Sequence, residues 1–269
     1  MFVNDLMRRP NKVRAKLARG ESVVGTAIYS SSPAMVSAAG YAGIDFVRID
    51  NEHSWRRDES LENMIRAAII ADVVPIVRVD RDDPFLIRKV LEIGAGGVLI
   101  PNVTCLQDAK DLVKAAKFAP MGERGIGPLC QSGEWGNRDR QEWISWSNRE
   151  PLVGVMIESA DVLADIDAIM ALDGIDFAAF GPSDYYMSIA SGSEADKAAE
   201  IQAALRTTIA AAKRSGKHVI YGAGLDEAEP KALRELGITM ICVSHDVVMI
   251  RKILETRVQE FAAANAASA

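Results

Sequence analysis

The feature that most constrains the fold of this chain is a regular alternation of short apolar runs and helix-like stretches. The apolar runs lie at 23–28, 46–50, 74–79, 97–101, 152–157, 176–180, 217–221 and 239–243. The helical patterns lie at 33–40, 61–72, 84–93, 106–116, 161–171, 195–215, 227–235 and 247–264. Near-continuous hydrophobic strands that alternate with helices indicate a parallel sheet covered on both faces. Eight such units in about 250 residues predict an α/β protein with one (β/α)₈ TIM barrel domain over residues 1–269.

The turn after the first strand favours a barrel over an open doubly wound sheet, the alternative fold. An open doubly wound sheet would usually carry a glycine-rich turn there, but the residues are Tyr29-Ser30-Ser31-Ser32-Pro33. One long irregular stretch, 118–150, interrupts the pattern and carries Trp135, Trp143 and Trp146. A connection of this length is usually functional or interfacial. We expect its tryptophans either to pack against a neighbouring subunit or to wall the substrate.

Composition narrows the choice of partners. The chain has 269 residues, is 49% hydrophobic and carries a net charge of −6, which gives no electrostatic reason to bind nucleic acid. No apolar run approaches the roughly 20 residues that span a bilayer, and the N-terminus lacks a signal-peptide pattern. Three widely spaced cysteines argue against a disulfide scaffold. We expect a cytoplasmic protein that binds neither nucleic acid nor membranes.

Two carboxylates follow neighbouring strands of the predicted barrel. Glu158 comes directly after the strand at 152–157, and Asp184 follows the strand at 176–180 through Gly181-Pro182-Ser183. Catalytic groups of such barrels gather where the strands end. Mg²⁺ and Mn²⁺ commonly take one or two carboxylates and complete their coordination with water and substrate oxygens. The pair predicts a metal site, and two helix-capping or ion-paired acids are the alternative.

Other strand ends supply groups for proton transfer and for binding oxygen anions. Asp50, Glu52 and His53 follow the second strand, and Arg78 ends the third. Histidine is the usual proton carrier near neutral pH, and arginine can fork to a carboxylate or polarise a carbonyl oxygen. We expect His53 and Arg78 to be catalytic. His245, after the eighth strand, is the reserve proton carrier, and an ion pair in the acidic loop at 80–83 is the alternative for Arg78.

The lysines exclude one mechanism. A Schiff-base aldolase needs a lysine inside the barrel near this rim, and none of the eleven lysines is predicted there. Stabilisation of an enolate is therefore expected from the metal ion and Arg78.

Taken together, the motifs resemble those of the HpcH/HpaI aldolase family. These are class II pyruvate aldolases, such as 4-hydroxy-2-oxoheptanedioate and 2-dehydro-3-deoxyglucarate aldolases. The resemblance covers about residues 20–255. In the order and spacing of the family, the matching motifs are Asp50-Asn51-Glu52-His53, Pro75-Ile76-Val77-Arg78-Val79, Asp83-Pro84, Gly94-Ala95-Gly96-Gly97-Val98, Gly122-Glu123-Arg124-Gly125, Ile157-Glu158 and Gly181-Pro182-Ser183-Asp184.

The resemblance implies a divalent metal ion held by Glu158 and Asp184, either Mg²⁺ or Mn²⁺, with Co²⁺ and Zn²⁺ as alternatives. It implies that pyruvate binds with its keto oxygen near Arg78 and its carboxylate near the backbone of Gly181, Pro182, Ser183 and Asp184. His53 would transfer protons, next to Asp50. The resemblance also implies hexamers, as trimers of dimers that exchange the last helix, which suits the long tail at 247–264.

Three positions depart from the family pattern. Met156 stands where a glutamine is common, and Gln131 or Ser132 replaces an arginine. The acid expected to partner the histidine is Glu92 rather than aspartate. Met156 and Trp135 lie in regions where the aldehyde would bind, so we expect a less polar aldehyde than in the named archetypes.

The expected reaction is the reversible retro-aldol cleavage of a 4-hydroxy-2-oxo acid to pyruvate and an aldehyde. Decarboxylation of oxaloacetate-like acids through the same enolate is the alternative. A non-catalytic ligand-binding protein would not need the polar groups at the strand ends. A phosphosugar enzyme could use Gly222-Ala223-Gly224 as its phosphate loop, but Asp246 after the next strand would repel a phosphate.

Overall fold

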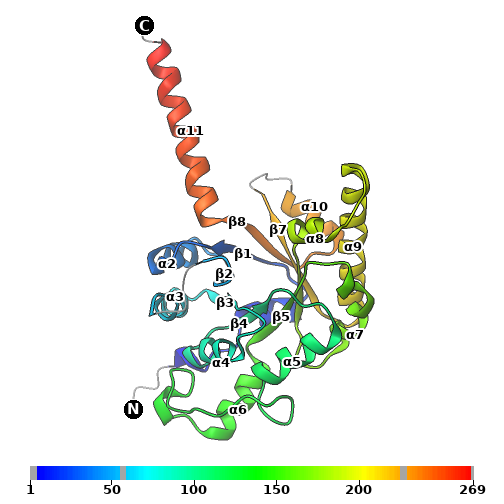
Figure 1. Ribbon diagram of the computed structural model, residues 1–269. Helices are drawn as coiled ribbons and strands as arrows, with labels where there is room; N and C mark the ends of the chain where they lie inside the picture. Colours follow the sequence, from blue (N-terminus) through cyan, green and yellow to red (C-terminus); the bar gives the residue numbers. More distant parts are fainter. Residues whose placement is uncertain (1–4, 55–58, 225–228, 268–269) are drawn as a thin grey trace.

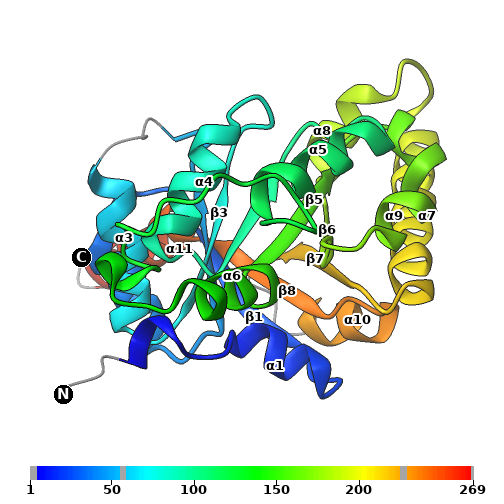
Figure 2. The same cartoon turned by 90° about the horizontal axis from the view of Figure 1, so that it is seen from below.

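The computed structural model describes residues 5–54, 59–224 and 229–267, and within them eight parallel strands close into a barrel (Figures 1 and 2). Each strand pairs with its neighbours in sequence, and the last pairs with the first. The predicted TIM barrel is confirmed. The strands are β1 (Val23–Ile28), β2 (Phe46–Asp50), β3 (Val74–Arg78), β4 (Gly97–Ile100), β5 (Leu152–Ile157), β6 (Phe177–Phe180), β7 (His218–Ala223) and β8 (Met240–His245).

Helices connect the strands on the outside. They are α1 (Lys12–Ala18), α2 (Pro33–Tyr41), α3 (Glu59–Ile70), α4 (Pro84–Ile93), α5 (Leu106–Ala116), α6 (Arg140–Arg149), α7 (Ile166–Ala171), α8 (Pro182–Ser188), α9 (Glu194–Arg214), α10 (Glu229–Leu236) and α11 (Asp246–Ala267). Short 3₁₀ turns lie at Asp5–Met7, Glu134–Gly136 and Asp161–Asp165. Local sequence sets several helix ends. Ser32 and Asp83 cap α2 and α4, each followed by a proline in the first turn, and Gly94 ends α4 at φ +110°.

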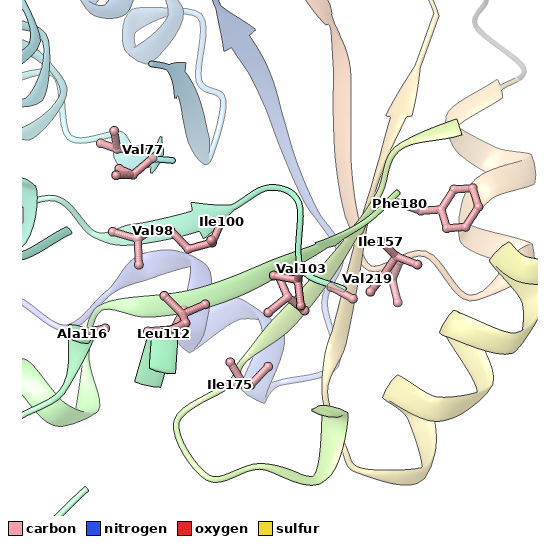
Figure 3. Packing of buried hydrophobic residues seen from close by; sticks show 14 of the residues in the cluster. Val77, Val98, Ile100, Val103, Leu112, Ala116, Ile157, Ile175, Phe180 and Val219 are labelled. Carbon is pink, nitrogen blue, oxygen red and sulfur yellow. The ribbon is translucent and has the colours of Figure 1, made fainter. Parts of the chain in front are cut away.

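The apolar core has two parts, because side chains of a strand alternate between its two faces. One part fills the barrel interior and includes Phe46, Leu99 and Phe177. The other lies between the strands and the outer helices. Figure 3 shows this outer layer, in which Val98 and Ile100 of β4 lie near Leu112 of α5.

The N-terminal end of the barrel is closed by α1. Val13 and Leu17 belong to the interior cluster and are buried. On the same helix, Arg14 forms an ion pair with Asp176 at 2.8 Å. Helix α1 therefore covers the floor of the barrel with its apolar side chains.

The long connection between α5 and β5 was predicted to be irregular, which is wrong for its second half. Asp139 caps α6 by accepting hydrogen bonds from Gln141 N and Glu142 N. Trp143 on this helix is buried and donates from its ring nitrogen to Ser132 Oγ at 3.2 Å. The helix was missed because its polar surface gives almost no apolar periodicity.

The last helix, α11, does not cover the barrel as the other outer helices do. Figure 1 shows that it projects away from the strands beyond the end of β8. Apolar side chains along it remain exposed: Val247, Ile250, Ile253, Leu254, Val258 and Phe261. No helix in the described ranges is both long enough and apolar enough to span a bilayer.

Candidate active site

Arg78, the last residue of β3, lies at the centre of a polar cluster at the C-terminal mouth of the barrel. Its Nε donates a hydrogen bond to Asp50 Oδ2 at 2.6 Å, and its Nη2 contacts the same oxygen. Its Nη1 lies 2.8 Å from Glu52 Oε2, without the alignment of a hydrogen bond. Burial lowers the pKa of Arg78, but the charges of Asp50, Tyr29 and Glu52 outweigh it and the pKa is raised. Arg78 is therefore a permanent cation in a fixed orientation.

Asp50 also positions the loop that carries His53. Its Oδ1 accepts a hydrogen bond from His53 N at 2.8 Å, and its carbonyl oxygen accepts one from Ser54 Oγ at 2.5 Å. The His53 side chain is 58% exposed, and its Nε2 lies 3.8 Å from Glu52 Oε2. The structure thus brings Asp50, His53 and Arg78 together, with His53 facing solvent at the rim.

Of the two predicted metal ligands, Glu158 directly follows β5, and Asp184 lies in the first turn of α8, which follows the adjacent strand β6. Glu158 is 8% exposed, and its Oε2 accepts a hydrogen bond from Asn102 N at 2.9 Å. Burial raises the pKa of Glu158, and the charges of Glu52 and Asp184 raise it further, against the effect of the Asn102 hydrogen bond. Among the residues that the structure describes, none forms a hydrogen bond or an ion pair with the Asp184 carboxylate. Asp184 is therefore not held by the capping or ion pairing that was its alternative role.

This arrangement fits a divalent cation. Glu52, Glu158 and Asp184 place negative charge close together, and Arg78 already compensates Asp50 and Glu52. A Cβ at Gly181 would lie 3.2 Å from Glu158 Oε1, so this glycine keeps that oxygen accessible. Within the described ranges, no group of three or more His, Cys, Asp or Glu residues could hold a metal by itself. Glu158 and Asp184 would therefore need water and substrate oxygens as further ligands.

The segment predicted to receive a carboxylate is the start of α8. The Gly181 N–H donates to Ile157 O at 3.0 Å, and Pro182 has no N–H, so neither can bind an anion through its amide. The first-turn N–H groups of Ser183 and Asp184 have no carbonyl partner within the helix. Of the predicted segment, Ser183 and Asp184 are therefore the residues whose backbone can bind a carboxylate.

Sequence reasoning missed two residues of the mouth. Tyr29 follows β1, and its hydroxyl accepts a hydrogen bond from Arg78 Nη2 at 3.1 Å. Asn102 follows β4 and has φ +56°; its N–H binds Glu158, and its Nδ2 donates to Glu52 Oε1 at 3.3 Å. Both residues follow predicted strands in the sequence, and this position is the feature by which they could have been predicted.

Glu92 and Trp135 are not part of this cluster within one chain. Glu92 lies in the last turn of α4, which leads to the start of β4, and it lines a surface groove together with Trp135. Burial raises the pKa of Glu92, and the charges of Arg124 and Arg88 only partly oppose it. Trp135 is 66% exposed.

Met156, in contrast, lies in the barrel interior beside the cluster, with its Sδ 3.8 Å from Arg78 Nη1.

Among the residues that the structure describes, no lysine stands at the mouth, although one is deeply buried elsewhere. Lys117 follows α5 and donates from Nζ to Asn148 O and Pro151 O, both at 2.9 Å. Pro151 immediately precedes β5, so this lysine lies at the opposite end of the barrel from Arg78. The mouth can bind oxygen anions, hold a hard cation and move a proton, but it lacks an amine for a Schiff base.

Comparison with known proteins agrees with this chemistry. Residues 26–252 match the model of the HpcH/HpaI aldolase/citrate lyase family. The chain is 28% identical to 2-keto-3-deoxy-L-rhamnonate aldolase from Klebsiella pneumoniae, over 96% of this chain and 95% of that protein. It is 29% identical to hydroxypyruvate/pyruvate aldolase from Pseudomonas aeruginosa, over 91% and 90%.

A solved HpcH/HpaI aldolase from Desulfitobacterium hafniense superposes with a TM-score of 0.85 at 28% identity, covering 93% of this chain and 96% of that one. The family match extends over most of the chain and includes every polar residue named at the mouth, from Tyr29 to His245. The resemblance found from the motifs is thus confirmed, as is the expectation of an aldolase or lyase. The chain belongs to the HpcH/HpaI aldolase/citrate lyase family.

Proposed function

We propose that this protein is a metal-dependent class II aldolase that reversibly cleaves a 4-hydroxy-2-oxo acid to pyruvate and an aldehyde. The observation that carries the proposal is the pair of carboxylates Glu158 and Asp184, which lie near a fixed Arg78 and form no ion pair with the residues that the structure describes. The names of the relatives support the reaction class. When bound, a divalent ion would supply Lewis-acid polarisation of the substrate oxygens.

The chain's own residues have separate roles in this proposal. Arg78, held by Asp50 and Glu52, would stabilise negative charge on the oxygen of the 2-oxo group. Its orientation is preset, so little reorganisation is needed as that charge develops. His53 would remove and return the proton at the hydroxyl or methyl carbon, because it is the exposed base at the rim. The backbone of Ser183 would bind the substrate carboxylate.

Decarboxylation of an oxaloacetate-like acid would use the same groups and remains the second candidate. It requires stabilisation of the same enolate but no site for an aldehyde. Pyruvate release should be measured with Mn²⁺ from 4-hydroxy-2-oxo acids and from oxaloacetate. We expect a larger kcat/KM for the hydroxy acids, and a clear preference for oxaloacetate would make the protein a decarboxylase.

We further propose that the protein is a homo-oligomer, a hexamer of three dimers, in which α11 packs on a second copy. The side chains of Val247, Ile250, Leu254, Val258 and Phe261 recur every three or four residues and are exposed in one chain. A second copy could also bring Glu92 and Trp135 to the mouth. Sedimentation of Leu254→Asp should show smaller particles, with Lys252→Asp as the control on the same helix. An unchanged mass for Leu254→Asp would refute the exchange.

A further inference from the structure

A second cationic position lies inside the barrel next to the cluster around Arg78. Ala27 of β1 pairs with Arg48 on β2 and with His245 on β8. Arg48 lies two residues from Phe46, which fills the interior, and two residues from Asp50, which binds Arg78. Because every second residue of a strand faces the same side, the Arg48 side chain also faces the interior. The small Ala27 side chain leaves the space between the two neighbours to Arg48 and His245.

An irregularity in β8 directs His245 to this position. The register of β1 with β8 shifts between Gly25–Cys242 and Ala27–His245, so β8 contains one extra residue there. Cys242 belongs to the interior cluster, and regular alternation would have turned His245 outward. Ser244 within the bulge has φ +49°, an uncommon conformation for a residue with a side chain. Bulges near active sites commonly re-aim a side chain in this way.

The residues around the bulge are held firmly. Asp246 is 1% exposed and accepts hydrogen bonds from Tyr29 N at 2.9 Å and Ser30 N at 3.1 Å. The Tyr29 ring packs edge-on against His245, with centroids 5.0 Å apart. Tyr29 thereby connects His245 with the cluster around Arg78, because its hydroxyl binds Arg78.

The charge of Arg48 is not compensated as that of Arg78 is. Arg78 contacts the carboxylates of Asp50 and Glu52, whereas Arg48 forms no ion pair with a carboxylate of the described chain. Its Nε is fully buried and has no hydrogen-bond partner, although the residue as a whole is only partly buried. The ring nitrogens of His245 likewise find no partner among the described residues. A buried donor left without a partner destabilises the protein, so a bound acceptor would recover that energy.

We infer that Arg48 and His245 form an anion subsite that binds a carboxylate on the aldehyde half of the substrate. This inference rests on the proposed aldol reaction and adds the class of the second product, an aldehyde that carries an acid group. Arginine can bind both carboxylate oxygens through two parallel N–H groups, and histidine can donate one more. The expectation of a less polar aldehyde, drawn from Met156 and Trp135, is replaced by this assignment for the β1–β2–β8 side of the mouth.

The test compares two aldehydes of the same shape that differ in charge. Succinic semialdehyde and 4-methylpentanal are each condensed with pyruvate in the presence of Mn²⁺, and the ratio of their kcat/KM values is measured. In the wild-type protein the ratio should favour the semialdehyde. Arg48→Met, which keeps length and removes charge, should reduce the ratio at least tenfold, and Arg48→Lys should give an intermediate value. Arg214→Met removes one charge from the outer surface, where Arg214 pairs with Asp167, and should leave the ratio unchanged.

Exchange of the pyruvate methyl protons with deuterium separates the two proposals, because this half-reaction needs no aldehyde. If wild-type protein does not catalyse exchange, the aldolase proposal itself fails. If exchange occurs and the ratio in Arg48→Met equals that of the wild type, the subsite is refuted while the aldolase proposal stands. Should Arg48→Met fail to fold, the same comparison is made with Arg48→Lys and His245→Asn, and an unchanged ratio in both also refutes the subsite.

Discussion

Both ends of the barrel contain buried charged side chains, but the partners of these side chains differ. At the N-terminal end, Glu150 is 7% exposed and accepts a hydrogen bond from Asn11 N at 2.8 Å, and Arg149 Nε lies 2.8 Å from its other oxygen. At the C-terminal end, Glu158 is 8% exposed, but its neighbours include two further carboxylates. Equal burial is therefore compatible with two purposes. The N-terminal charges hold segments of this chain together, whereas the C-terminal charges are arranged for a ligand.

Lys117 illustrates the structural use of charge. It donates to two backbone carbonyls and thereby ties the end of α5 to the residues before β5. Arg14 and Asp176 similarly join α1 to the start of β6. Substitutions at this end should change stability, and substitutions at the mouth should change catalysis.

The largest effect is expected for Glu158→Gln. A Lewis-acidic ion contributes several kcal/mol, so its loss should slow pyruvate methyl exchange by about a thousandfold or more. Mn²⁺ affinity, measured by calorimetry, should fall with it. Glu150→Gln is the matched control at the other end, and it should keep exchange within about twofold while losing about 1 kcal/mol of stability. Equal losses of exchange in both variants would abolish the distinction between the two ends.

The next effect concerns the pH dependence of stability. Burial lowers the pKa of Lys117 to about 8, from an ordinary value of 10.5. Between these values the unfolded chain binds the proton and the folded chain releases it, so stability rises with pH across this window. A shift of this size corresponds to about 3 kcal/mol.

Lys117→Met should lack this contribution. The free energy of unfolding is measured by urea titration from pH 7 to 10 for both proteins. The difference between wild type and variant should change by up to about 3 kcal/mol over this range, while exchange activity at pH 7.5 is retained. A pH-independent difference would show that Lys117 is not desolvated as the structure describes.

His53→Ala should slow proton transfer by about a hundredfold, a typical contribution of a general base. The variant should bind Mn²⁺ as the wild type does, because His53 contacts Glu52 rather than Glu158 or Asp184. His218→Ala is the control at the start of β7, where the ring lies 3.3 Å from Thr239 Oγ1. Wild-type exchange in His53→Ala would move the role of the base to His245.

A smaller effect, about tenfold, is expected for Arg78→Lys. Lysine keeps the charge but cannot contact Asp50, Glu52 and Tyr29 at the same time, because it lacks the planar fork. Arg14→Lys serves as the control, since one ion pair with Asp176 can be kept by an ammonium group. If Arg78→Lys retains more than about a third of wild-type kcat/KM, less than about 1 kcal/mol of transition-state stabilisation was at stake and Arg78 is structural.

The sequence predicted the barrel well because its strands are buried on both faces and read as uninterrupted apolar runs. β1, β2 and β5 begin and end where the runs do, whereas α6 was missed because it packs through isolated tryptophans. That the whole chain forms one domain stays a prediction. The site was predictable where a residue ends a strand, as for Glu158 and Arg78. The contacts of Tyr29 and Asn102, and the bulge at Ser244, depend on loop and register geometry that no local pattern encodes.

The most direct test of the account is the exchange of pyruvate methyl protons in protein stripped of metal by a chelator. We predict that exchange falls to the uncatalysed rate after stripping and returns when Mn²⁺ is added. Borohydride should trap no substrate on the protein in either state. Undiminished exchange after complete metal removal, together with borohydride trapping of pyruvate on the protein, would contradict a mouth built around Glu158 and Asp184 as ligands of a divalent ion.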